Sequence, residues 1–255
     1  MRVFTLIFSL SLVIFSCNKD DDTGRRRDLQ ADRIDVSMKP WVNQDHSYGR
    51  LIDIDGNEYA TIRFGNYEWM AENLKTSRFC NGDSILHEPE PIEWSNLNSA
   101  AWSHFDNNPQ FDFAVGKLYN GFSAIDSRNI CPCNWRVPTE EDWDILISAY
   151  SGTMRAGDFL KSEVTNRSSS DPDWFWQPEN FGANNSSGFS SLPGGERSHY
   201  GEFNWMGVTG QWWSSSEGAG GGLRAYAMVF MVGSTSKGNI SRKSGLSIRC
   251  VRDIE

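Results

Sequence analysis

Side chains able to catalyse a reaction occur in this chain, but not in the spacings of familiar catalytic sites. The sequence lacks Gly-x-Ser-x-Gly, His-Glu-x-x-His and the glycine loops that bind phosphate or dinucleotides. Neighbouring carboxylates occur in 171–173 and in 140–142. A turn around Pro172 accounts for the first group, and capping of a helix start accounts for the second. We therefore predict no catalytic residues.

Metal ligands are equally dispersed. The four histidines are scattered, and one residue separates Cys131 from Cys133 where a zinc knuckle has two to four. The segment 177–180, Gln-Pro-Glu-Asn, resembles the calcium-ligand loop of C-type lectins. It precedes the predicted strand that this loop should follow, so its placement argues against such a site. We predict no metal site and no cofactor, with Ca²⁺ as the alternative because oxygen-rich loops bind it without that motif.

Eleven tryptophans form the other conspicuous chemical feature. Exposed aromatic rings stack on sugars, and exposed apolar patches mark contact surfaces. Trp212 and Trp213 must point to opposite faces of a predicted strand, so we expect at most one of them in the core. Trp174 and Trp176 stand in a loop-like stretch beside Asp, Pro and Ser. We predict that Trp174, Trp176 and one of Trp212 or Trp213 contact a ligand.

The first 16 residues predict export. Arg2 precedes an apolar run from Val3 to Phe15, which is shorter than the roughly 20 residues needed to cross a bilayer. The run ends in Ile-Phe-Ser-Cys, which resembles the lipobox of bacterial lipoproteins and marks Cys17 as the lipid attachment site. Several acyl chains on Cys17 would anchor the protein stably to a membrane.

The charged segment after Cys17 indicates to which membrane, and on which side of it, the lipid attaches the protein. Residues 18–22, Asn-Lys-Asp-Asp-Asp, resemble the export signal that sends Bacteroidetes lipoproteins to the cell surface. We predict an outer-membrane lipoprotein that faces the extracellular side. Residues 1–16 are then the signal peptide, 17–45 the lipidated Cys and a flexible charged stalk, and 46–255 the domain.

The four remaining cysteines are Cys80, Cys131, Cys133 and Cys250. An even number in an exported chain predicts two disulfides, for which three pairings exist. Cysteines separated by one residue rarely bond each other, so Cys131 and Cys133 should pair with Cys80 and Cys250 in some order.

Composition excludes several classes of protein. The formal net charge of −9 gives no basic footprint for nucleic acid, and 38% hydrophobic residues suffice for a packed core. No segment after the first is long and apolar enough to span a membrane.

Local patterns predict a mixture of short strands and one principal helix. A hairpin should turn at 55–57, Asp-Gly-Asn, between strands 51–54 and 59–64, and a further strand should cover 67–70. Thr139 should cap a helix that ends at Gly152 and buries Trp143, Leu146, Ile147 and Tyr150. Further strands are expected at 188–192, 211–214, 224–232 and 246–251, so the fold class is α+β.

Several phrases in order resemble the Fibrobacter succinogenes major paralogous domain family. They are DGNEY at 55–59, EWMAENLKT at 68–76, GKLYN at 116–120, CP at 131–132, WRVPT at 135–139, GF at 188–189, LPGG at 192–195, WWSSSE at 212–217 and SIRCVRD at 247–253. The resemblance runs from about Ile52 to Asp253.

The resemblance implies a C-type lectin-like fold in which Cys131 pairs with Cys250. Cys80 and Cys133 stand where the family usually has other residues. They therefore either form a disulfide with each other or stay unpaired. The resulting hypothesis is a non-catalytic binding or adhesion module for a glycan or a surface protein. The alternatives are an enzyme related to the formylglycine-generating group and a structural component of the cell envelope.

Overall fold

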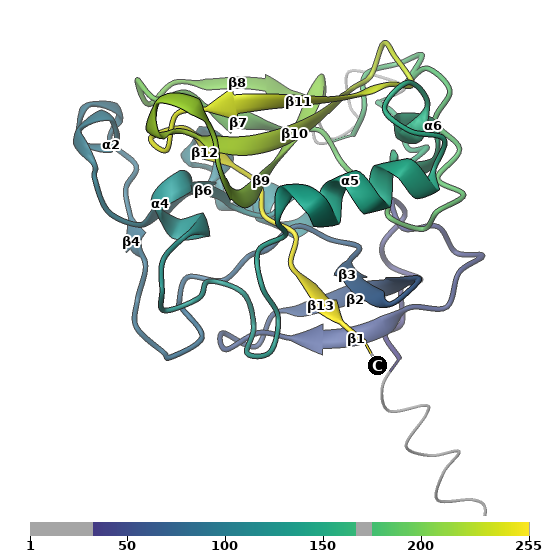
Figure 1. The fold of residues 1–255 in the computed structure, drawn as a ribbon, viewed down its shortest axis with the longest axis horizontal. Helices are drawn as coiled ribbons and strands as arrows, with labels where there is room; N and C mark the ends of the chain where they lie inside the picture. Colours follow the sequence, from purple (N-terminus) through teal and green to yellow (C-terminus); the bar gives the residue numbers. More distant parts are fainter. Residues whose placement is uncertain (1–32, 167–174, 255) are drawn as a thin grey trace, which may run out of the picture. The chain divides into compact units, whose positions relative to one another are not determined.

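A four-stranded antiparallel sheet joins the beginning and the end of the domain (Figure 1). Its strands, in spatial order, are β1 (Gly49–Ile52), β2 (Glu58–Phe64), β3 (Tyr67–Met70) and β13 (Val251–Asp253). The computed structural model describes residues 33–166 and 175–254. The signal peptide, Cys17 and Trp174 lie outside the described residues. Within the described part, no helix is both long and apolar enough to cross a bilayer.

The predicted hairpin between β1 and β2 is confirmed. Gly56 takes a φ of 84°, and the carboxylate of Asp53 accepts hydrogen bonds from the backbone N–H groups of Asp55 and Asn57, both at 2.9 Å. Asp53 also accepts from the hydroxyl of Tyr59 at 2.5 Å. This turn therefore fixes the register in which Leu51 faces Tyr59.

A second, larger sheet carries most of the remaining strands. Its path is β11 (Thr235–Ile240), β10 (Leu223–Val229), β9 (Thr209–Glu217), β7 (Gly194–Arg197), β12 (Gly245–Leu246), β6 (Leu118–Asn120), β5 (Ala101–Ser103) and β4 (Leu86–His87), with β8 (Phe203–Met206) paired to β7. The last predicted strand, 246–251, is split: Leu246 ends β12 in this sheet and Val251 begins β13 in the other. The chain end thus connects the two sheets.

The predicted strand at 188–192 is wrong. This segment forms a loop with a single bridge from Ser191 to Lys161. The backbone carbonyls of Phe189 and Ser190 accept hydrogen bonds from the guanidinium of Arg249 instead of from a neighbouring strand. The side chain of Arg249, about 60 residues further along the chain, therefore provides the hydrogen bonds that a neighbouring strand would otherwise provide.

The helices are short except for the predicted one. They are α2 (Pro91–Asn96), α3 (Asp112–Val115), α4 (Gly121–Ala124), α5 (Glu140–Ala149) and α6 (Ala156–Leu160), with 3₁₀ turns at Phe105–Asn107, Pro109–Phe111 and Ala219–Gly221. Thr139 caps α5 in a capping box with Asp142, and Trp143, Leu146 and Ile147 are buried, as predicted. Tyr150, which was also expected to be buried, lies just after the helix and is half-buried. Gly152 follows with a φ of 69° and donates to the carbonyl of Ile147 at 3.0 Å. The α+β class is thereby confirmed.

The predicted stalk is too long. Residues 33–45 pack on the domain, where Val36, Trp41 and Val42 are buried in one hydrophobic cluster with Ala60 and Ile62 of β2. The carbonyl of Trp41 accepts a hydrogen bond from the hydroxyl of Ser162 at 2.8 Å. The high charge density of this segment gave no indication that three of its apolar residues pack against residues distant in sequence. The compact domain therefore begins near residue 33.

Both predicted disulfides are present. Cys131 pairs with Cys250 and ties the segment before α5 to the segment before β13, while Cys80 pairs with Cys133. Cys131 and Cys250 are fully buried in the hydrophobic cluster that contains Trp213 and Leu246. The pairing that the family resemblance implies is therefore confirmed.

Candidate ligand-binding surface

The phrases that carry the family resemblance build the interior. Arg249 is buried and donates to Oδ1 of Asn73 at 2.8 Å and to the carbonyl of Ser190 at 3.0 Å. Burial lowers the pKa of Arg249 to about 9. Asn73 also accepts from the indole of Trp212 at 2.9 Å. These polar residues satisfy one another inside the core, so the phrases position the scaffold.

The predicted contact role of Trp212 or Trp213 is wrong, because both side chains are fully buried. They do point to opposite faces of β9, but each face has a hydrophobic cluster against it. Trp212 lies in the cluster of α5, with its ring 6.2 Å from that of Trp143. Trp213 lies in the other cluster and donates to the carbonyl of Tyr119 at 2.7 Å. Both faces of β9 are therefore covered at these two positions.

Trp176 is also a core residue and not a contact residue. It is fully buried, and its indole N–H donates to the carbonyl of Ser191 at 2.9 Å. The ammonium of Lys161 lies 5.5 Å from its ring centroid. The side chain of Trp176 therefore points into the core.

Lys161 holds that loop region together. Its ammonium donates to the carbonyls of Phe181, Val229 and Val232 at 3.0, 3.2 and 2.9 Å. Burial lowers the pKa of Lys161 to about 8. The side-chain amide of Asn180, in the calcium-like segment, donates to the carbonyl of Ser162 at 2.8 Å. In the described ranges no group of three or more His, Cys, Asp or Glu side chains could hold a metal ion.

Trp205 is the exposed tryptophan that the sequence analysis missed. Ten of the eleven tryptophans lie in the described residues; nine of these are buried, whereas Trp205 is 58% exposed. Its φ is 67°, in the left-handed region that bulky residues avoid. Strained backbone conformations cluster at functional sites, which makes Trp205 a candidate contact residue. The sequence around Trp205 did carry one indication of its exposure, because Glu202, Asn204 and Gly207 are polar or small residues close to it in the chain.

The register of β7 and β8 explains this conformation. Gly194 pairs with Met206 and Glu196 pairs with Asn204, which leaves Gly195 and Trp205 between the two pairs. Gly195 also has a left-handed φ, of 65°, and a Cβ there would lie 2.5 Å from the carbonyl oxygen of Asn204. Gly195 and Trp205 lie across from each other on the two strands, and both have a left-handed backbone. This interrupts the usual alternation of side chains between the two faces of the sheet and leaves the indole of Trp205 largely in solvent.

A buried arginine supports the tip of the hairpin that bears Trp205. Arg197 donates from Nε to the carbonyl of Gly201 at 3.0 Å and from Nη2 to the carbonyl of Pro89 at 2.8 Å. Its guanidinium lies 4.3 Å from the ring of Trp94 and 4.8 Å from that of Phe203. These contacts fasten the tip of the hairpin to the segment before α2, so the surface around Trp205 stands on a rigid base.

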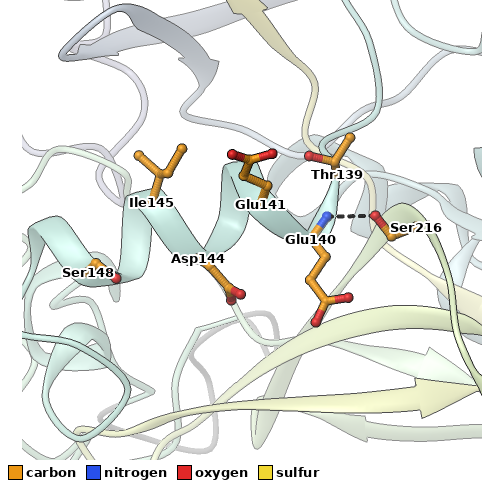
Figure 2. A pocket seen from close by; sticks show the side chains of 7 residues that line it. All are labelled: Thr139, Glu140, Glu141, Asp144, Ile145, Ser148 and Ser216. Atoms are coloured by element: carbon orange, nitrogen blue, oxygen red, sulfur yellow. Dashed lines mark hydrogen bonds between the residues drawn. The ribbon is translucent and has the colours of Figure 1, made fainter.

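A separate hollow of about 730 Å³ lies along the exposed side of α5 (Figure 2). Its lining residues are Thr139, Glu140, Glu141, Asp144, Ile145, Ser148 and Ser216. Figure 2 shows Glu140 and Asp144 on one side of the helix and Glu141 and Ile145 on the other, with the hydrogen bond from Glu140 N to Ser216 Oγ at 2.8 Å.

Three acids of α5, Glu140, Asp142 and Asp144, are paired with neighbouring groups. Lys237 lies 2.7 Å from Glu140 and 3.0 Å from Asp144, and the hydroxyl of Tyr226 donates to Asp144 at 2.7 Å. Asp142 accepts from Arg136 at 2.9 Å and from the Thr139 backbone at 2.7 Å. Burial alone would raise the pKa of Asp142, but these hydrogen bonds lower it below its ordinary value. The predicted capping role is confirmed.

Comparison with known proteins identifies the domain. The family model described as Fibrobacter succinogenes major domain matches residues 62–252. Comparisons with curated proteins and with solved structures give no match. The matched range begins within β2 and contains the larger sheet, both disulfides and the hairpin that bears Trp205. The chain therefore belongs to the Fibrobacter succinogenes major domain family.

Proposed function

We propose that this protein is a cell-surface lipoprotein whose domain binds a glycan without catalysis, through the exposed face of Trp205. The observation that carries the proposal is the contrast between Trp205 and the nine buried tryptophans. An exposed indole offers a large flat apolar face, which suits the apolar faces of sugar rings. The polar neighbours Glu202 and Asn204 could bind sugar hydroxyls beside it.

Rigidity supports this assignment. A residue held at a φ of 67° needs surroundings that over-determine its backbone. The carbonyl of Trp205 accepts from Val208 N at 3.0 Å, and Gly207 donates to Pro193 at 3.0 Å and accepts from Gln177 at 2.8 Å. A backbone that is already fixed loses little conformational entropy on binding.

We also propose a C-type lectin-like fold for the domain. Support comes from β1 and β13, which bring both ends of the domain into one sheet, and from the long loops between β6 and β9. An experimental structure of the domain, compared with lectin-like domains, would test this. A different strand order from the one expected of lectin-like domains would contradict it.

The lipid anchor is proposed from the lipobox at 14–17 and the charged residues after it. We expect radiolabelled palmitate to enter the wild-type protein in cells and the Cys17→Ser variant to stay unlabelled and soluble. Accessibility of the wild type to protease added outside intact cells would place it on the surface. Equal labelling of the two proteins would contradict the anchor.

A glycan array tests the binding proposal. The full chain with Cys17→Ser serves as the soluble parent, and Trp205→Ala should abolish binding to the glycans that the parent retains. Phe113→Ala is the matched control, because Phe113 is an aromatic residue of similar exposure, 57%. The proposal fails if Trp205→Ala binds like the parent. It also fails if the parent binds a surface protein of the same bacterium and no glycan.

A further inference from the structure

A second hollow, of about 540 Å³, is cationic although the chain as a whole is acidic. Its lining residues are Phe122, Ala219, Gly220, Gly221, Gly222, Asn239, Ser241, Arg242 and Lys243. The two charged residues among them, Arg242 and Lys243, are both basic, whereas the chain carries a net charge of −9. This local reversal of charge favours a negatively charged ligand.

The glycine-rich floor of this hollow is built around Asn239. A Cβ at Gly218 would lie 1.7 Å from Oδ1 of Asn239, and one at Gly222 would lie 2.8 Å from it. The amide of Asn239 donates to the carbonyl of Ala219 at 2.6 Å. Gly220 and Gly221 take φ values of 63° and 78°, with open space where a Cβ would be. Bare backbone therefore faces the hollow, and a ligand can approach it closely.

Arg242 has a donor to spare. Its Nη2 donates to Glu217 at 2.9 Å, but its Nε is buried and has no hydrogen-bond partner. The backbone of Arg242 is held in place, because its carbonyl accepts from Gly121 N at 2.7 Å. A buried N–H without an acceptor costs free energy, and a shift of the Arg242 side chain that brings Nε to a ligand oxygen would recover it.

A carboxylate matches this arginine best. A guanidinium presents parallel N–H groups that fit the two oxygens of a carboxylate, and Glu217 already uses one of them. The side chain of Glu217 is 79% exposed, so a ligand carboxylate could displace it at little cost. The ammonium of Lys243 is held by the carbonyl of Ser95 at 2.7 Å and adds positive charge to the hollow.

We propose that this hollow binds the carboxylate of an acidic sugar, a uronic acid residue of a polysaccharide. Arg242 would hold the carboxylate, and Ser241 and the backbone of 220–222 would contact the ring hydroxyls. The choice of a sugar rests on the proposed glycan function, but the site is separate from Trp205. Its occupancy can therefore be measured independently of that residue.

The test follows the backbone amide signals of Gly220, Gly221 and Gly222 by NMR while glucuronate is added to the full chain with Cys17→Ser. These signals should shift with glucuronate and stay in place with glucose. Arg242→Gln should abolish the shifts, and Glu217→Gln should strengthen binding several-fold because it removes the competing carboxylate. Arg128→Gln removes an arginine that also forms ion pairs with acidic side chains; it is the matched control and should bind normally.

Clear outcomes would overturn the assignment. Unchanged shifts in Arg242→Gln would remove the arginine from the site, and weaker binding in Glu217→Gln would contradict the competition. Equal shifts with inorganic phosphate would mean a general anion site. Arg242→Lys keeps the charge without the planar fork and should bind at least tenfold more weakly, which covers the case in which Arg242→Gln fails to fold. Loss of glucuronate binding in Trp205→Ala would show that the two sites are one.

Discussion

Replacing Trp205 by alanine and by glycine tests whether its backbone is held in the left-handed region. In an ordinary strand, alanine is more stable than glycine by about 0.5–1 kcal/mol, because glycine loses more conformational freedom on folding. At a φ of 67° the order should reverse. An L-residue pays roughly 1–2 kcal/mol in that region and glycine does not.

The magnitudes can be worked from the exposure of the ring. Trp205 is 58% exposed, so less than half of its surface is buried. At about 25 cal/mol per Å² and roughly 200 Å² for a fully buried indole, either truncation costs about 2 kcal/mol of packing. Relief of strain should then leave Trp205→Gly about 0.5–1 kcal/mol more stable than Trp205→Ala, after the entropic cost of glycine is subtracted.

Thermal unfolding followed by circular dichroism provides the measurement. A difference of about 1 kcal/mol moves the Tm by roughly 2–4 °C in a domain of this size, so the glycine variant should melt a few degrees above the alanine variant. The neighbouring Asn204, which has an ordinary φ, is the control, and there alanine should melt above glycine. If alanine is the more stable variant at position 205 as well, the strained backbone and the argument built on it are refuted.

Three further predictions concern the scaffold. Cys131→Ser should destabilise the domain more than Cys133→Ser in non-reducing urea titrations. The Cys131–Cys250 bond closes 119 residues and contributes about 5 kcal/mol, whereas the Cys80–Cys133 bond closes 53 residues and contributes about 4 kcal/mol, and Cys131 is also buried. Equal urea midpoints of the two variants would contradict this. The pKa of Asp142 is lowered from 3.8 in the folded protein, so the ionised carboxylate stabilises the fold at pH values above 3.8. Asp142→Asn should therefore lower the free energy of unfolding most at pH 7, and the effect should shrink as the pH falls below 3.8. An effect of the substitution that does not change with pH would contradict the ion pair with Arg136. Arg249→Met should cost about 3–5 kcal/mol, because two buried carbonyls lose a charged donor and Asn73 keeps only Trp212 as its donor; an unchanged Tm would argue against this network.

Local rules explain the parts of the fold that could be predicted. The turn at Gly56 and the capping of α5 by Thr139 and Asp142 each depend on residues within one turn of chain. The glycine-rich stretch was visible in the sequence, but its association with Arg242 was not, since these residues are about 20 positions apart and meet only when β10 and β11 pair.

Residue types and short spacings by themselves determined the hairpin, the principal helix, the α+β class and, through the order of the phrases, the family. Only the tertiary structure decided which tryptophans are exposed. Trp212 and Trp213 are both buried because β9 has a cluster on each face, whose members come from distant parts of the chain. Trp205 is exposed because its pairing with β7 places it opposite Gly195 in a left-handed conformation. Burial depends on which segments meet in space, and that pairing is not encoded within any short stretch of sequence.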